Sequence, residues 1–236
     1  MTRIALVFTL AAGTLIGAAD EFSTSAGPLK ITPIQHASVL IQAGGKVLYV
    51  DPAQGNYDGL PKADYILVTD IHGDHLAPAI VDKLKTSSTL VLAPQAAADK
   101  LPGCTVIANG QTKAAGPFSL EAVPMYNLKR GPSEGKFFHD KGRGNGYVVT
   151  YGGKRFYFSG DTEGIPEMRA LRNIDAAFVC MNLPYTMTPA EAADAVKAFH
   201  PKVVYPYHYR GQDLGIFAKA LDGTGIEVRQ REWYPN

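Results

Sequence analysis

Four side chains that can bind a metal ion lie close together in the stretch "TDIHGDHLAP": Asp70, His72, Asp74 and His75. Zinc and related divalent cations are held in proteins by neutral imidazole nitrogens and carboxylate oxygens. Asp74 and His75 are adjacent, so a tight loop can turn both toward one cation, whereas Asp70 and His72 can face a second position together. The cluster predicts a metal centre, and a two-metal centre, a one-metal centre and a relic remain open as alternatives.

Two more candidate ligands follow later in the chain. Asp161 stands in "SGDT", where Gly160 allows the backbone to approach a site closely. His208 stands in "YHY", directly after an apolar run. A lone Gly-Asp pair is more often a turn, but the whole set of side chains favours a bound cation. Such a cation lowers the pKa of its bound water to about 7 and so supplies hydroxide at neutral pH.

Each candidate follows a run of residues that predicts a buried strand. The apolar run Tyr65–Val68 precedes the first cluster, "RFYF" precedes Asp161, and "KVVYPY" precedes His208. Residues that converge from the ends of several strands are the usual way in which α/β folds build their sites. We therefore expect the two later residues to join the first cluster in space.

The elements between these strands predict two sheets with helices outside. Gly44-Gly45 and the pair in "YGGKRF" are hairpin turns between apolar runs. Thr188, Pro189 and Glu191 are typical of the start of a helix, which we expect to end near Phe199. The segment 127–146, rich in Gly, Lys and Arg, is the longest expected loop, and long loops in compact domains are often functional.

The composition is that of one globular domain. The chain has 236 residues, which is enough for one large domain with a substantial core or for at most two small domains. The net charge is +1 and the basic residues are scattered, so nothing directs the protein toward nucleic acid. Cys180 lies in an apolar run and is expected to be a buried free thiol; it and Cys104 do not make a disulfide framework.

The N-terminus is typical of a secretory signal. Arg3 precedes an apolar stretch that ends at Ala19, and a polar run begins at Asp20. The stretch is short for a membrane span, so we expect residues 1–19 to be a cleaved signal peptide, with an uncleaved anchor as the alternative. The expectation is a periplasmic or secreted protein without a stable membrane span, whose folded domain occupies 26–236.

Five motifs together resemble the metallo-β-lactamase fold superfamily. They are "HASVLI", "VDP", "TDIHGDH" in place of the family's T-H-x-H-x-D-H, "SGDTEG" and "PYHY". Within the superfamily the chain is similar to the branch of ascorbate-phosphate lactonases and N-acylphosphatidylethanolamine phospholipases. The resemblance spans most of the chain after the signal, and it implies an α/β fold: an αββα sandwich of two mixed β-sheets with helices on the outer faces.

The resemblance also implies roles for the candidate ligands. Asp74, His75 and His208 would hold the family's second metal, Asp161 would bridge the two metals, and His72 would belong to the first metal. His36 resembles a histidine that lies near the site in this branch, although a core histidine bonded to the backbone is an equal alternative. Asp51, in "VDP", is expected to be a turn carboxylate or to orient a ligand from behind.

Two positions depart from the family pattern, and both affect the first metal site. Asp70 replaces the first histidine of the motif, and Asn127 stands where the middle histidine is expected. Asp70 would then bind through oxygen, giving a harder site that suits manganese, iron or zinc; or His139 would replace the lost imidazole; or the first site would be empty.

The function implied is that of a metal-dependent hydrolase. One or two divalent cations, with zinc as the first choice, would supply metal-bound hydroxide that attacks an ester, lactone or phosphodiester bond, and Asp74 would orient or deprotonate the nucleophile. A donor such as Tyr209, Asn127 or Lys141 would stabilise the developing negative charge.

The substrate expected is a small molecule. Lys141, Arg143 and Arg210 would favour an anionic one. A β-lactamase proper is disfavoured, because Asp161 stands where the resistance enzymes carry a cysteine. The alternative is an exported, non-catalytic metal or ligand binder with a degenerate first metal site.

Overall fold

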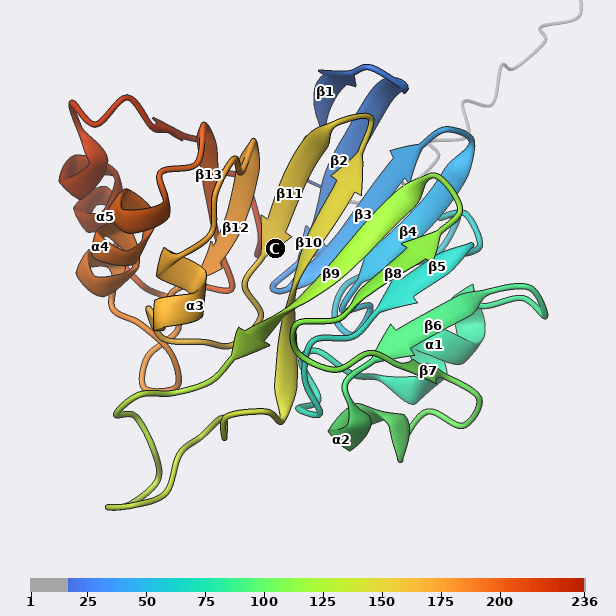
Figure 1. The fold of residues 1–236 in the computed structure, drawn as a ribbon, viewed down its shortest axis with the longest axis horizontal. Helices are drawn as coiled ribbons and strands as arrows, with labels where there is room; N and C mark the ends of the chain where they lie inside the picture. The colour runs from blue at the N-terminus through green and yellow to red at the C-terminus, as the bar shows by residue number, and fades with distance from the viewer. Residues whose placement is uncertain (1–16, 236) are drawn as a thin grey trace, which may run out of the picture.

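The computed structural model describes residues 17–235. Within these residues the chain forms two seven-stranded sheets that pack face to face, with helices on the outside (Figure 1). The αββα sandwich expected from the sequence is confirmed. Most of the predicted signal peptide, residues 1–16, lies outside the described residues.

The first sheet is built from the N-terminal half of the chain. Its strands are, in spatial order, β1 (Asp20–Thr24), β2 (Gly27–Gln35), β3 (Ser38–Ala43), β4 (Lys46–Val50), β5 (Tyr65–Leu67), β6 (Leu90–Ala93) and β7 (Thr105–Val106). The strands from β1 to β4 are antiparallel neighbours, and those from β4 to β7 are parallel. The ends of β5 and its parallel neighbours therefore meet at one edge of the sheet.

The second sheet repeats this plan. Its strands, again in spatial order, are β14 (Glu227–Val228), β13 (Val203–Tyr207), β12 (Ala176–Cys180), β11 (Lys154–Phe158), β10 (Gly144–Tyr151), β9 (Phe118–Met125) and β8 (Thr112–Ala115). The strands from β8 to β11 are antiparallel and those from β11 to β14 are parallel. Both predicted Gly-Gly hairpins are confirmed, joining β3 to β4 and β10 to β11.

The helices are short and lie beside the sheets (Figure 1). They are α1 (Pro78–Leu84), α2 (Gln95–Ala98), α3 (Pro166–Arg169), α4 (Pro189–Phe199) and α5 (Leu214–Leu221). The predicted start of α4 is confirmed: the Thr188 hydroxyl accepts from the Glu191 backbone N–H, and the Glu191 carboxylate accepts from the Thr188 N–H. Among residues 17–235, no helix combines the length and the apolarity that crossing a membrane requires.

Successive side chains along the strands of the first sheet point to opposite faces, so they contribute to two separate apolar clusters. Val39 and Ile41 of β3 face the second sheet, whereas Leu40 packs with residues of α1 such as Val81 and Leu84. Because both faces of the sheet are covered, its strands read as nearly continuous apolar runs rather than alternating ones.

The folded region begins before residue 26, the expected start of the domain. β1 begins at Asp20, whose carboxylate forms ion pairs with Arg229 and Arg231, and Phe22 packs edge-on against Phe156 with ring centroids 5.1 Å apart. The strand was missed because it lies at the edge of its sheet, and its stabilising partners are at the far end of the chain. Near the C-terminus, the last strand, β14, spans only Glu227–Val228.

The two sheets approach each other where β5 ends and β10 begins. The Asn145 N–H donates to the Thr69 carbonyl across this junction, at 2.9 Å. Gly144 makes the approach possible, because a Cβ atom there would lie 2.2 Å from the Met125 side chain and 2.9 Å from the Thr69 carbonyl oxygen. This junction brings the loop after β5 against the loop that precedes β10.

Candidate metal centre

Two groups of possible ligands come together at this edge of the sandwich. The first site consists of Asp70, His72 and His139, and the second site consists of Asp74, His75, Asp161 and His208. Within each group, one ligand atom from every residue lies within 4.8 Å of the others. All six residues predicted from the sequence are therefore brought together, and His139 joins them.

The second site is compact. His75 Nε2 lies 3.3 Å from one oxygen of Asp161, and His208 Nε2 lies 3.4 Å from the other. His208 Nε2 is also 3.3 Å from Asp74 Oδ2. Asp74 alone of the four is substantially exposed, with 28 % of its side chain accessible, so it lies on the side from which a substrate would enter.

Asp161 lies between the two sites. Its Oδ2 atom is 3.3 Å from His75 Nε2 of the second site and 3.2 Å from His139 Nε2 of the first. The first site is completed by His72, whose Nδ1 is 3.0 Å from Asp70 Oδ2. This is the bridging position that the family resemblance implied for Asp161.

The structure brings the imidazole of His139 to the first site and keeps Asn127 out of it. Asn127 Oδ1 accepts from His139 Nδ1 at 2.7 Å and from its backbone N–H at 2.8 Å, which turns Nε2 of the ring toward Asp161. The Asn127 amide group donates to Glu163 and to the Tyr185 carbonyl. Asn127 is thus buried with its amide group engaged inside the protein, which does not support its expected role as a donor to the substrate.

The unsatisfied atoms of the centre fit a cation. Among residues 17–235, no hydrogen-bond partner is found for Nε2 of His75, His139 and His208, or for Asp161 Oδ1, although all are buried. Buried polar atoms almost always have a partner, so a group of orphaned lone pairs that faces one point requires an explanation. Imidazole nitrogens and carboxylate oxygens are ligands for zinc, manganese and iron.

Asp51 holds His75 from behind. Its carboxylate accepts from His75 Nδ1 at 2.7 Å and from the backbone and hydroxyl of Thr69. The bond places the proton on Nδ1 and leaves Nε2 free to face the second site. Of the two roles left open by the sequence, orientation of a ligand is the one that the contacts support.

His36 plays a similar part toward Asp74. Its Nε2 lies 3.1 Å from Asp74 Oδ2, and its Nδ1 lies 2.6 Å from the Tyr234 hydroxyl. Burial lowers the pKa of His36 to about 4, even though Asp74 acts in the opposite direction. A neutral ring that donates from Nε2 to Asp74 can accept from Tyr234 at Nδ1, so His36 positions Asp74.

The carboxylates of the second site are ionised at neutral pH. Burial by itself would raise the pKa of Asp74, but the close contacts of its carboxylate with His208 and His36 outweigh burial and lower that pKa. Burial likewise opposes ionisation of Asp161, and the neighbouring imidazoles of His208 and His75 shift its pKa well below the ordinary value. Two negative charges, one buried on Asp161 and one partly exposed on Asp74, make the second site attractive to a cation.

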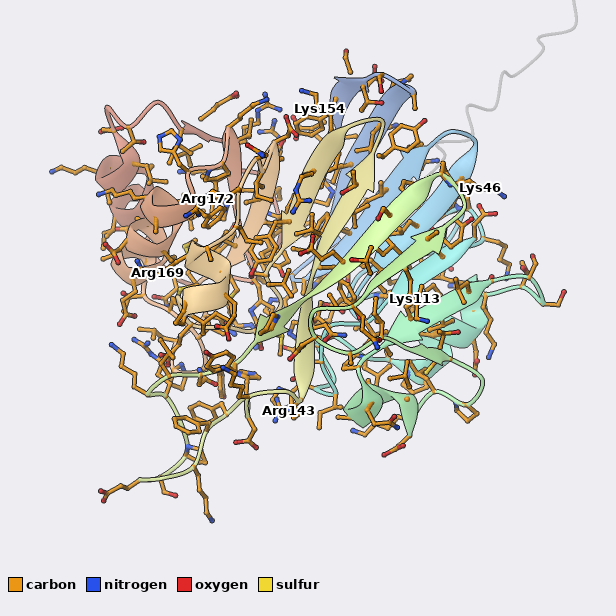
Figure 2. The ribbon with its side chains drawn as sticks, in the orientation of Figure 1. Lys46, Lys113, Arg143, Lys154, Arg169 and Arg172 are labelled. Atoms are coloured by element: carbon orange, nitrogen blue, oxygen red, sulfur yellow. The ribbon has the colours of Figure 1, made fainter. Side chains whose placement is uncertain are left out.

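The basic residues expected to face an anionic substrate are mostly paired. Arg143 donates from Nε and Nη2 to the two oxygens of Asp70, and Figure 2 shows it at the start of β10. Lys141 donates to Glu167 at 2.9 Å and also contacts the Tyr126 hydroxyl. Among residues 17–235, Arg210 has no ion pair, so it is the basic side chain left available.

Glu163 is a structural residue of the site that the sequence did not identify. Its carboxylate accepts from the backbone N–H groups of Leu128, Lys129 and Arg130, and from Asn127. Glu163 thereby holds the loop that holds His139. The one sequence feature that could have indicated this role is the position of Glu163 in "SGDTEG", two residues after Asp161.

The chain matches a known family over most of its length. Residues 30–208 match the model of the Beta-lactamase superfamily domain. A UPF0173 metal-dependent hydrolase of Anaeromyxobacter dehalogenans is 31% identical over 226 residues, covering 86% of this chain and 80% of that protein. One from Archaeoglobus fulgidus is 30% identical, covering 85% of this chain and 94% of that protein.

A solved structure agrees with the sequence relatives. The crystal structure of a candidate metal-dependent hydrolase from Parabacteroides distasonis has a TM-score of 0.87 and 42% sequence identity, covering 92% of this chain and 99% of that one. The paired sheets, the convergent histidines and aspartates and these relatives lead to one conclusion: the chain belongs to the metallo-β-lactamase superfamily and is one of its metal-dependent hydrolases.

Proposed function

We propose that the protein hydrolyses an ester, lactone or phosphodiester bond of a small molecule, using one or two divalent cations, of which zinc fits best. The observation that carries the proposal is the convergence of buried, unpartnered imidazole and carboxylate atoms on the second site. In terms of ligand hardness, imidazole nitrogen is a borderline donor and carboxylate oxygen a hard one. Zinc commonly takes four such donor atoms in tetrahedral geometry.

The residues of the second site have two different roles, metal binding and orientation of the attacking water. A divalent cation bound there would lower the pKa of a bound water to about 7 and polarise a substrate oxygen. Asp74, partly exposed to solvent and held by His36, is placed to orient the water and to hold its proton at Oδ2. The other three residues of the site are buried and serve as ligands.

An anionic substrate is supported by Arg210. It follows the ligand His208 closely in the chain and is exposed, and its backbone N–H donates to the Tyr234 hydroxyl that also contacts His36. Its backbone therefore lies close to the residues that hold Asp74, and its side chain is exposed beside them. Lys141 and Arg143 contribute less to this expectation, because each is engaged by a carboxylate.

The test is metal content combined with hydrolysis. We expect protein purified without chelator to contain a divalent cation by elemental analysis, and to hydrolyse members of a panel of esters, lactones and phosphodiesters. Asp161→Ala should lose metal and activity together, because Asp161 contacts both sites. A metal-loaded protein that is inert toward the whole panel would favour the alternative, an exported non-catalytic binder.

Export is proposed on the N-terminal sequence alone. Cleavage near Ala19 would leave Asp20 at the start of the mature chain, which is also the first residue of β1. N-terminal sequencing of protein from the periplasm or the medium should begin near Asp20. A mature protein that still begins at Met1 would contradict the proposal.

A further inference from the structure

The two metal sites differ in their surroundings, because one of them already contains a cation from the protein. Arg143 Nε donates to Asp70 Oδ1 at 3.0 Å, and Arg143 Nη2 donates to Asp70 Oδ2 at 2.8 Å. Asp70 is fully buried, and 18 % of the Arg143 side chain is exposed. Such two-point pairs between a guanidinium and a carboxylate are strong and fixed in geometry.

The pair is built into the backbone. Gly144 follows Arg143 and packs so closely on the loop after β5 that a Cβ atom would clash with Met125 and Thr69. The Asn145 N–H then donates to the carbonyl of Thr69, the residue before Asp70. The start of β10 is therefore tied to the Asp70 loop directly beside the ion pair.

The charges of the two sites are unequal as a result. The second site has two carboxylates, Asp74 and Asp161, and the nearest protein groups behind them are imidazoles. In the first site both oxygens of Asp70 already accept from Arg143, and Oδ2 also lies 3.0 Å from His72 Nδ1. Only the shared Asp161 remains as an uncompensated anion for a cation in the first site.

We propose that Arg143 takes over part of the role of the first metal, so that the chain binds one divalent cation tightly in the second site and another in the first site much more weakly. This rests on metal binding as given under the proposed function. A cation in the first site must share Asp70 with a guanidinium group and is repelled by it. A charged hydrogen-bonded pair is expected to change the affinity by about tenfold or more.

The experiment measures the number and affinity of bound Zn²⁺ ions, independently of activity. The full chain is freed of metal with a chelator and titrated with Zn²⁺ in competition with a chromophoric chelator, and the metal retained after dialysis is counted by elemental analysis. We expect one equivalent to be retained by the wild type, and a second to bind at least about tenfold more weakly.

Variants locate each equivalent. Arg143→Gln should tighten the second equivalent by about tenfold or more, because Asp70 loses its internal partner. His208→Gln should lose the tight equivalent, whereas His72→Gln should keep it. Arg231→Gln is the matched control: Arg231 forms the same two-point pair with Asp20, at 2.8 and 2.6 Å, but at β1.

Several results would overturn the proposal. They are two equivalents of equal affinity in the wild type, loss of the tight equivalent in His72→Gln, or an unchanged second equivalent in folded Arg143→Gln. If Arg143→Gln does not fold, the Zn²⁺ affinities of the wild type, His72→Gln and His208→Gln still test the proposal. If two Zn²⁺ ions bind with equal affinity and the protein hydrolyses the panel, this inference is rejected and the proposed function stands. If one Zn²⁺ ion binds tightly and the protein is inert, the proposed function is rejected and this inference stands.

Discussion

At the scale of single residues, the centre depends on partners that hold the rings from behind. His75 is oriented by the carboxylate of Asp51, and His139 by the amide oxygen of Asn127. Both bonds use Nδ1 and leave Nε2 toward the centre. The two partners differ in charge, and an anionic partner makes the ring a more basic ligand.

The Asp51 carboxylate is expected to matter for metal affinity although it lies outside the ligand set. Asp51→Asn should weaken binding in the second site by about 10- to 100-fold, because the ring loses its anionic partner and its fixed tautomer. Zn²⁺ titration against a competing chelator measures the change.

Asp64 provides the control for this variant. Asp64 also accepts from a backbone N–H, that of Val47, and pairs with Lys46. It precedes β5, whereas Asp51 contacts Thr69 beyond the other end of that strand. Asp64→Asn should keep the wild-type metal affinity. Equal affinities in wild type and Asp51→Asn would show that the contact does not support the ligand.

At the scale of elements, the loop from β9 to β10 is attached to the start of α4. Glu191, the third residue of α4, completes the capping box with Thr188. The same carboxylate also pairs with Lys129 and Arg130, both at 2.6 Å. Helix α4 thereby anchors the loop whose neighbouring residue, Asn127, orients His139.

The Glu191 ion pairs predict a pH-dependent stability difference. Burial opposes its ionisation, but hydrogen bonds from Lys129, the Thr188 backbone and Arg130 lower the pKa of Glu191 from 4.5 to about 2. Because the folded pKa lies below the unfolded one, the stabilisation is complete above about pH 4.5 and disappears as the pH falls toward 2.

Glu191→Gln tests this prediction, since glutamine keeps an acceptor for the cap but has no charge. At pH 7 the variant should unfold at a lower urea concentration than the wild type, and the difference should shrink between pH 4.5 and about 2. Urea titrations at a series of pH values measure it. A difference that is constant with pH would mean that the ion pairs do not contribute.

At the scale of the whole molecule, residues from the N-terminal and C-terminal parts of the described chain meet beside the second site. His36 follows β2, and its Nδ1 lies against the hydroxyl of Tyr234, near the C-terminus. The His36 backbone N–H donates to the carbonyl of Trp233, which is buried against Phe178 and Tyr207. The last residues of the chain thus close the sandwich beside the second site.

Tyr234→Phe should separate catalysis from metal binding. Without the hydroxyl, His36 loses the partner that selects its tautomer, and its hydrogen bond to Asp74 weakens. We expect kcat to fall by about tenfold, with metal content unchanged, because the Tyr234 hydroxyl bonds to His36 and to the Arg210 backbone rather than to a ligand of the second site. Steady-state kinetics with elemental analysis test this, and Tyr65→Phe, which changes a tyrosine in β5, is the control. Loss of metal in Tyr234→Phe would assign it a structural role.

The sequence by itself determined the kinds of ligand, their order and the strands that carry them. Apolar runs that end in Asp70, Asp161 and His208 identify strand ends, because burial of those runs depends on local patterning. The two Gly-Gly hairpins and the cap of α4 follow from equally local rules. Their placement at one edge follows from the parallel order of the strands.

Only the tertiary structure decided which loop residues complete the centre. His139 lies in the first site because Asn127, which is itself held by Glu163 on a separate segment, turns its ring inward. Arg143 neutralises Asp70 because the two sheets meet at Gly144. Loop side chains take their direction from contacts between residues distant in the chain, and those contacts leave no periodic pattern in the sequence.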